Sequence, residues 1–298
     1  METRSSVANL IVSLRPDQWT KNLIVYAALI FAVRLFDPAA LALATAAVLI
    51  FCALSGAVYL INDVSDREAD RQHPLKRMRP IASGALAPST ALAWAAVLSI
   101  AGLAAAFALR FSFGIAAASY VALVIVYSRA LKHVVILDVM AIAIGFVLRA
   151  VAGGLVIGVP ISDWLLVCTI LGALFLGLAK RRHELTLLAD GATGHRRILE
   201  EYDPYLLDQM IAVVAAATLV AYIIYCASPE TAEKFGTRWL VLTTPFPIYG
   251  IFRYLYLVHR RHGGGSPSEL LLRDRPLLSC VALWGLAVVL IIYRPYAS

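Results

Sequence analysis

Nine apolar runs, each near the length of a membrane-crossing helix, divide this chain of 298 residues. A helix needs about 20 apolar residues to cross the hydrocarbon core of a bilayer. Hydrophobic residues make up 61% of the chain and the mean hydropathy is +0.79, far above soluble proteins. We therefore expect an all-α integral membrane protein with nine transmembrane helices, near residues 22–36, 40–61, 86–109, 112–128, 135–157, 163–180, 206–227, 238–258 and 277–293.

Basic residues are unevenly divided between the two sets of loops that these spans define. The N-terminal segment and the second, fourth, sixth and eighth loops, with Arg253, hold twenty of the twenty-six Lys and Arg residues. The other loops and the C-terminus hold five, and Arg149 lies inside the fifth span. By the positive-inside rule, the N-terminus is predicted in the cytoplasm and the C-terminus outside.

The long polar segments all fall on the predicted cytoplasmic side. They lie near residues 62–85, 181–205 and 259–276, whereas the outer loops are short. The chain is therefore predicted to be one domain over residues 1–298, multi-pass in a membrane, with its chemistry on the cytoplasmic face. The net charge of +7 is attributed to this topology and not to a nucleic-acid partner, because basic residues in membrane proteins follow orientation.

The segment NDVSDREADRQHPLKRMRPIASG, residues 62–84, gathers nine charged side chains in a chain with 15% charged residues. On a helix, Asp63, Asp66 and Asp70 would share one face within about 60°. Carboxylates that repel one another in this way are tolerated when a divalent cation neutralises them, and oxygen ligands suit Mg²⁺. We predict a Mg²⁺ site formed by these three catalytic aspartates, with Asp63 and Asp66 closest to the chemistry and Asn62 and Asp70 supporting them.

The alternative for this segment is a solvated loop whose acids pair with Arg67 and Arg71. The metal site is favoured because the segment directly follows the second apolar run, so its first carboxylate lies at the membrane boundary. A metal beside a basic loop would bind a diphosphate, with positive charge on both sides of the anion. Such a loop follows the acids, with cations at Lys76, Arg77 and Arg79.

Several motifs in order carry a family resemblance. NDxxDxxxD and HPxKxxRPIASG in residues 62–84 are accompanied by RPDQWTKN (15–22), YSRALKHVVILDV (127–139) and KRRHEL (180–185). Together they resemble the UbiA superfamily of intramembrane transferases, in its polyprenyl-phosphate phosphoribosyltransferase branch. The resemblance implies nine transmembrane helices, a Mg²⁺-bound diphosphate and a place in a bacterial cell (inner) membrane.

One motif departs from the aromatic prenyltransferases of this superfamily. They carry a second aspartate-rich motif after the sixth span, where this chain has Lys180, Arg181, Arg182 and Glu184. Cations in place of acids suit a substrate with an additional phosphate, such as phosphoribosyl pyrophosphate, whose 5′-phosphate would meet Lys180 and Arg181. The alternative is that these cations only enforce topology.

Further polar side chains are predicted to line the cytoplasmic opening of the same site. Asp138 is a candidate for orienting a ribose hydroxyl. For Arg149, deep in its span, an ion pair with another helix and a ligand contact are left open. For Lys21 and Asn22, a phosphate contact and a snorkelling anchor beside Trp19 are left open. The full set of candidate substrate-binding residues is Lys21, Asn22, Tyr59, Lys76, Arg79, Tyr127, Lys132, Asp138, Arg149, Lys180, Arg181 and Glu184.

The resemblance implies transfer of 5-phosphoribose from phosphoribosyl pyrophosphate to a polyprenyl phosphate. The lipid phosphate is largely ionised near neutral pH, so its oxygen needs little help from a general base. A prenyltransferase with an aromatic acceptor is the alternative within the fold, and an anion transporter or a membrane scaffold is the alternative outside it. Self-association is left open.

Overall fold

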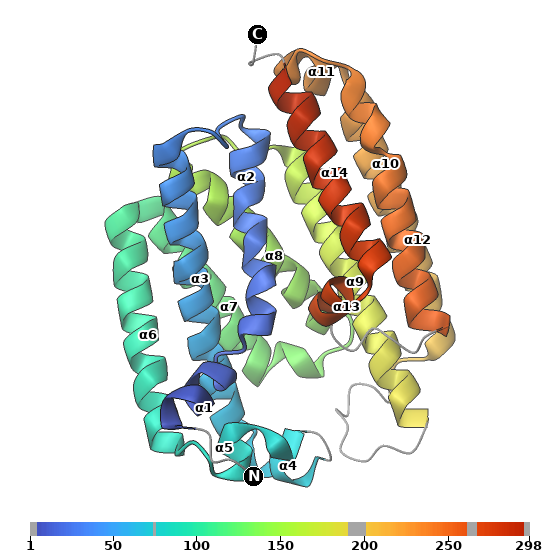
Figure 1. The fold of residues 1–298 in the computed structure, drawn as a ribbon. Coiled ribbons are helices and arrows are strands. Elements are labelled where there is room, and N and C mark those ends of the chain that lie inside the picture. Colours follow the sequence, from blue (N-terminus) through green and yellow to red (C-terminus); the bar gives the residue numbers. More distant parts are fainter. Residues whose placement is uncertain (1–4, 74–75, 190–200, 261–266, 295–298) are drawn as a thin grey trace.

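The computed structural model describes residues 5–73, 76–189, 201–260 and 267–294, and within these ranges it contains helices and no strands. The all-α prediction is therefore confirmed for the described part (Figure 1). The helices are α1 (Ser6–Ser13), η1 (Pro16–Val25), α2 (Tyr26–Phe31), α3 (Pro38–Ser65), α4 (Arg67–Gln72), η2 (Lys76–Met78), α5 (Pro80–Ser83), α6 (Pro88–Leu109), α7 (Phe111–Arg129), η3 (Leu131–His133), α8 (Leu137–Ile157), α9 (Asp163–Ala189), α10 (Pro204–Ala227), α11 (Pro229–Phe235), η5 (Trp239–Thr243), α12 (Pro245–Arg260), α13 (Pro267–Arg273) and α14 (Arg275–Tyr293).

Seven helices among the described residues are long and apolar enough to cross a membrane. They are α3, α6, α7, α8, α9, α10 and α14, and each matches one predicted span. The predicted span 22–36 is instead divided between η1 and α2, and the span 238–258 between η5 and α12. The second break falls at Pro245, the first residue of α12, where the missing N–H is tolerated. Nine continuous spanning helices are therefore not observed.

Proline and aspartate begin several of the long helices. Pro38 and Pro204 occupy the first helical turn, where the missing N–H is not needed. The preceding Asp37 and Asp203 accept hydrogen bonds from the first free backbone amides of those helices. Asp274 does the same for α14 by accepting from the Leu277 amide.

Small residues allow η1 to pack closely against α8. A Cβ at Gly153 would lie 2.2 Å from the Val25 carbonyl oxygen, so this contact requires glycine. Close backbone approach at small residues is the usual way in which helices associate in membranes. The contact fixes the depth of η1 in the bundle and places Asn22 beside Arg149 of α8.

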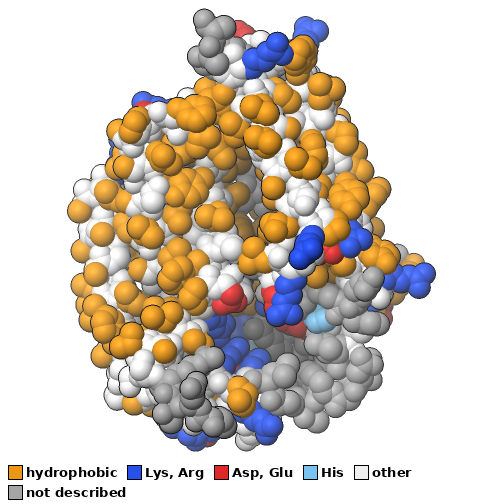
Figure 2. Space-filling model, viewed as in Figure 1, with side chains coloured by type: hydrophobic (Ala, Val, Ile, Leu, Met, Phe, Trp, Pro, Cys, Tyr) orange, Lys and Arg blue, Asp and Glu red, His pale blue; other side chains and the backbone are white. Residues whose placement is uncertain are grey.

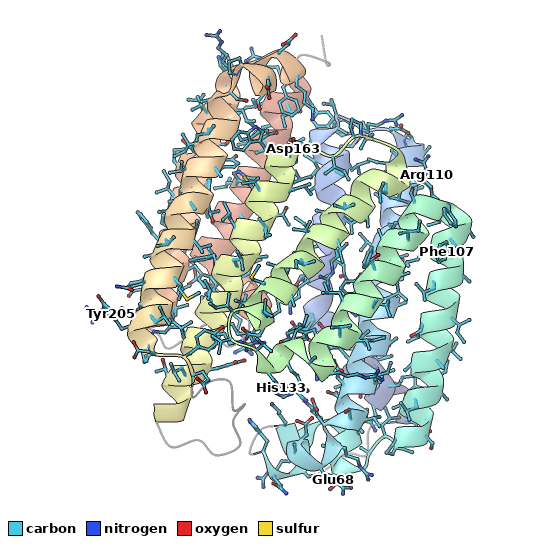
Figure 3. All side chains as sticks on the ribbon, turned by 180° about the vertical axis from the view of Figure 1, so that it is seen from behind. Glu68, Phe107, Arg110, His133, Asp163 and Tyr205 are labelled. Carbon is cyan, nitrogen blue, oxygen red and sulfur yellow. The ribbon has the colours of Figure 1, made fainter. Side chains whose placement is uncertain are left out.

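The short helices α4, α5, η3 and α13 gather at one end of the bundle, which we call the aspartate end (Figure 1). Helix α1 also lies there, whereas α14 ends at the opposite end. Figure 3 shows Glu68 and His133 at the aspartate end and Arg110 and Asp163 at the other. Of the three long polar segments, 62–85 is almost wholly described, while 190–200 and 261–266 lie outside the described residues.

Candidate active site

Two aspartates of the predicted metal motif are buried at the aspartate end and share one guanidinium. Asp63 and Asp70 are each 3% exposed. Arg79 Nη1 donates to Asp70 Oδ2 at 2.6 Å and to Asp63 Oδ1 at 3.2 Å. Arg15 Nη2 donates to the same Asp63 oxygen at 2.5 Å. Two buried carboxylates and two arginines from distant segments thus form one network, which we call the carboxylate cluster.

The third aspartate diverges from this cluster. Helix α3 ends at Ser65 and α4 begins at Arg67, so Asp66 lies at the break with φ −91° and ψ 7°. Its half-exposed carboxylate faces Lys132 Nζ, 3.7 Å away. The expectation that all three aspartates share one helix face is therefore wrong, because the helix is interrupted between them.

The alternative ion pairs considered for this segment are also not those observed. Arg71 pairs with the exposed Glu68 at 3.2 Å and donates to the Ala82 carbonyl. The Arg67 Nε is buried without a hydrogen-bond partner among the described atoms. Neither arginine contacts the buried aspartates, which are held by Arg79 of the same segment and, at Asp63, by the distant Arg15.

Arg15 belongs to this cluster although it was not among the candidate residues. It adopts φ 54° and ψ 65°, a left-handed conformation that is uncommon for a side chain other than glycine. Pro16 follows it and begins η1, so the chain turns sharply here. The turn directs the guanidinium over the Tyr59 ring, 4.7 Å from its centroid, and onto Asp63. Strained backbone of this kind often accompanies functional sites.

The oxygen donors of the cluster fit a hard divalent cation such as Mg²⁺. Asp63 and Asp70 approach the same Arg79 nitrogen, so a positive charge already lies between them. Within the described residues no three His, Cys, Asp or Glu side chains converge at metal-ligand distance. That Asp63 and Asp70 hold the metal, with Asn62 and Asp66 nearby in the chain, stays a prediction.

Arg149 is a deeper cation with neutral partners. It is 6% exposed, and its Nε donates to Asn22 Oδ1 at 2.8 Å. Its other nitrogens donate to the Gly145 carbonyl at 3.0 Å and the Tyr120 hydroxyl at 2.7 Å. The guanidinium also lies 4.4 Å from the Tyr120 ring centroid. Among the described residues it has no carboxylate partner, so the predicted alternative of an ion pair is not observed there.

Lys21 lies in the same positive region. Burial, followed by the charges of Lys180, Arg149 and Arg15, lowers the pKa of Lys21 to about 7. Asp17 opposes this shift, but its effect is smaller than those of the cations. These neighbouring cations give the region an excess of positive charge. An anionic ligand would reduce the repulsion between them.

Asp138 and Arg181 form a buried ion pair between α8 and α9. Asp138 is 0% and Arg181 1% exposed, and Arg181 Nε donates to Asp138 Oδ2 at 2.5 Å. The remaining Arg181 nitrogens donate to Glu184 and to the Tyr127 hydroxyl, the latter at 3.3 Å. Both side chains are thus engaged within the protein, and their predicted contacts with substrate stay predictions.

A strained turn supports this ion pair. Ile136 has φ 69° and ψ −46°, and the Leu137 amide donates to the Val135 carbonyl at 2.8 Å, which defines a γ-turn. The Tyr202 hydroxyl accepts from the Ile136 amide and donates to Asp138, both at 2.8 Å. Burial raises the pKa of Tyr202 to about 12, so its hydroxyl stays protonated as a donor. Sequence analysis did not predict Tyr202, which lies far along the chain from Asp138.

The other candidate residues surround the same mouth. Figure 2 shows Lys and Arg side chains gathered in a hollow at the aspartate end, between the α1–α8 and α9–α14 parts of the bundle. Lys180 lies 3.9 Å from Glu184 and influences Lys21. The Lys76 backbone amide donates to His73 Nδ1 at 3.3 Å. Two open depressions of about 400 and 630 Å³ lie at the opposite end, away from this chemistry, so the charged network and not a cavity marks the site.

Comparison with known proteins identifies the family. The model of the UbiA prenyltransferase family matches residues 22–271, most of the chain. The chain belongs to the UbiA prenyltransferase family. The structure of a UbiA homolog from Archaeoglobus fulgidus, bound to GPP and Mg²⁺, superposes with a TM-score of 0.70 at 21% identity. The alignment covers 98% of this chain and 99% of that one, so the UbiA fold extends over the whole molecule.

Several curated relatives carry one name. A decaprenyl-phosphate phosphoribosyltransferase from Mycolicibacterium smegmatis is 36% identical, with 94% of this chain and 91% of the relative covered. A protein of the same name from Corynebacterium glutamicum is 32% identical, with 95% and 86% covered. The resemblance inferred from the motifs is therefore confirmed.

The UbiA match also separates two kinds of site residue. Asp63, Asp70 and Arg79 lie inside the matched range, whereas Arg15 and Lys21 precede its first residue, Asn22. The cation that contacts Asp63 from the N-terminal segment, Arg15, thus comes from outside the matched range. The signal available in the sequence was the run RPDQWTKN, in which only Lys21 and Asn22 were assigned a role.

Proposed function

We propose that this protein transfers 5-phosphoribose from phosphoribosyl pyrophosphate to a polyprenyl phosphate, with Mg²⁺ as cofactor. The names of the curated relatives support this reaction class. We further propose that the aspartate end faces the cytoplasm of a bacterial inner membrane. In that topology η1 with α2, and η5 with α12, complete nine crossings, and the C-terminus is outside.

The observation that carries the proposal is the presence of two separate groups of cations. Arg15 and Arg79 contact the acids of the carboxylate cluster. Lys21 and Arg149 lie in a second positive region, where Arg149 has neutral partners among the described residues. Phosphoribosyl pyrophosphate and a lipid phosphate together bring a diphosphate and two monophosphates, more than a prenyl diphosphate with an aromatic acceptor. Two positive regions suit the larger negative charge of these two substrates.

The residues of the site are proposed to have different roles in the reaction. Asp63 and Asp70 would hold Mg²⁺, which supplies positive charge to the departing diphosphate when bound. Arg79 and Arg15 lie against these acids and can donate to the same diphosphate oxygens. Lys21 and the cations around it would orient a further phosphate. The new bond joins a lipid phosphate oxygen to ribose C1, and the bond from C1 to the diphosphate oxygen breaks.

A two-substrate comparison tests the proposed function. Purified protein with Mg²⁺ is incubated with pentose-labelled phosphoribosyl pyrophosphate and a polyprenyl phosphate, and separately with a labelled prenyl diphosphate and an aromatic acid. We expect label in the lipid fraction only with the first pair, and loss of that product in EDTA. Arg149→Met provides a variant that lacks the deep cation and should lower the first activity. Prenylation of the aromatic acid without pentose transfer would overturn the proposal.

Lys21 leads to an expected pH dependence. Because its pKa is lowered to about 7, the ammonium is charged below that pH and neutral above it. An anion binds the charged form, so KM for phosphoribosyl pyrophosphate should rise by up to about tenfold per pH unit above pH 7. Lys21→Arg keeps the charge and should give a flat KM between about pH 7 and 9. Steady-state kinetics over this range measure both profiles, and an equal rise in the variant would assign the effect to another group.

A further inference from the structure

Helix α1 exposes large apolar side chains and buries two polar ones. Asn9 and Ser13 are 8% and 2% exposed, so these two polar side chains point into the protein. Val7, Ile11 and Val12 are 66%, 49% and 41% exposed. A surface helix in water shows the opposite pattern, with its apolar stripe toward the core. The exposed face of α1 is therefore suited to an apolar surrounding.

The polar side of α1 is satisfied by hydrogen bonds within the protein. Asn9 Nδ2 donates to the Ala85 carbonyl at 3.2 Å, and Ser13 Oγ donates to the Asn9 carbonyl at 2.9 Å. Ser5 caps the first turn by accepting from the Ala8 amide. Helix α1 contains no charged residue, so its outer face offers no ion pair to a soluble partner or to a lipid headgroup.

The depth of α1 agrees with a lipid surrounding. A Cβ on Gly56 would lie 2.9 Å from Leu14 Cδ2, so the end of α1 packs tightly on α3 at this glycine. Gly56 lies nine residues before Ser65, the last residue of α3. At 1.5 Å per residue the contact is about 14 Å along the helix from that end. Figure 1 shows α1 beside the lower part of α3.

We propose that α1 docks into the acyl-chain boundary of the bilayer at the aspartate end, and so holds Arg15 in the carboxylate cluster. Val7, Ile11 and Val12 contact lipid, while Leu14 anchors the helix to Gly56. Arg15 follows Leu14 directly and takes its left-handed turn there. Apolar surface on α3 extends past this contact, since Ile61, nearer the same end of α3 than Gly56, is 38% exposed. Burial of the α1 side chains in lipid stabilises the helix. The inference concerns the surface of α1 and does not depend on the reaction that the site performs.

Spin labelling of the full chain in lipid nanodiscs tests this placement. The four native cysteines are replaced by alanine, and single labels are introduced with Val7→Cys and Ile11→Cys. Oxygen concentrates in the bilayer and a nickel chelate in water, so their relative effects on relaxation report the surrounding of each label. Val97→Cys in α6 is the lipid-facing control, since Val97 is 54% exposed on a spanning helix. Glu68→Cys, on the exposed side of α4, is the control in water.

At residues 7 and 11, as at residue 97, we expect oxygen to change the relaxation of the spin label more than the nickel chelate does. At residue 68 we expect the reverse. A nickel effect at residue 11 equal to that at residue 68 would overturn the proposal, because α1 would then face water. Dipolar broadening between labels at residue 11 would overturn it in favour of a second copy of the chain. Both labels are on exposed side chains, so the substitutions should leave the fold intact.

Discussion

Asp63→Asn is expected to lower phosphoribosyl transfer by about a thousandfold, because one change removes a proposed metal ligand and the partner of two arginines. The carboxylate is buried and accepts from Arg15 and Arg79 on the same oxygen. The amide keeps the shape of the side chain but not its charge. Initial rates at saturating substrates measure the loss, and titration with Mg²⁺ should show half-maximal activity at a higher metal concentration than in the unaltered protein.

Glu68→Gln provides the matched control for this prediction. It also removes one carboxylate from the segment 62–84, but Glu68 is exposed and pairs only at the surface with Arg71. Exposed pairs contribute at most about 1 kcal/mol, so its activity should stay within about fivefold. If the two variants lost activity equally, general charge in the segment and not the buried cluster would be responsible. Thermal unfolding of both variants separates loss of fold from loss of chemistry.

The helical spans could be predicted from the sequence because each one is determined by the residues within it. Long apolar runs must form helices in a bilayer, where each backbone polar group needs a partner within its own segment. The boundaries of α3, α6, α7, α8, α10 and α14 follow from this rule. The end of α9 at Ala189 does not, because the helix continues past the apolar run through residues that favour helix. The breaks within η1–α2 and η5–α12 also depend on packing and prolines that hydropathy alone does not weigh.

The candidate site was predictable only in part, for a related reason. The spacing of Asp63 and Asp70 pointed to a shared cation, and the structure brings both onto Arg79. Arg15 and Tyr202 were not predicted, because their positions depend on a left-handed residue and on the packing of distant segments. For Arg149, the alternatives were an acid or a ligand. Its observed partners are an amide, a carbonyl and a hydroxyl. These groups are uncharged, so the pattern of charges in the sequence could not identify them.

Arg181→Met is expected to destabilise the fold by about 3–5 kcal/mol, because it leaves the buried Asp138 carboxylate without its counter-ion. Arg181 and Asp138 are almost completely buried, and the pair joins α8 to α9. Arg182→Met is the matched control, since Arg182 pairs with Asp208 at 3.1 Å in a partly exposed position and should cost much less. Thermal unfolding in detergent compares the two variants.

The double variant Asp138→Leu with Arg181→Met decides what the pair does. Removing both charges avoids a lone buried ion, so we expect it to recover much of the stability that either single change loses. Such recovery supports a structural pair between α8 and α9. The alternative is that Arg181 holds the 5′-phosphate, as the basic motif after the sixth span first indicated. In that case Arg181→Met would unfold normally but raise KM for phosphoribosyl pyrophosphate, and the double variant would show the same KM without any gain in stability.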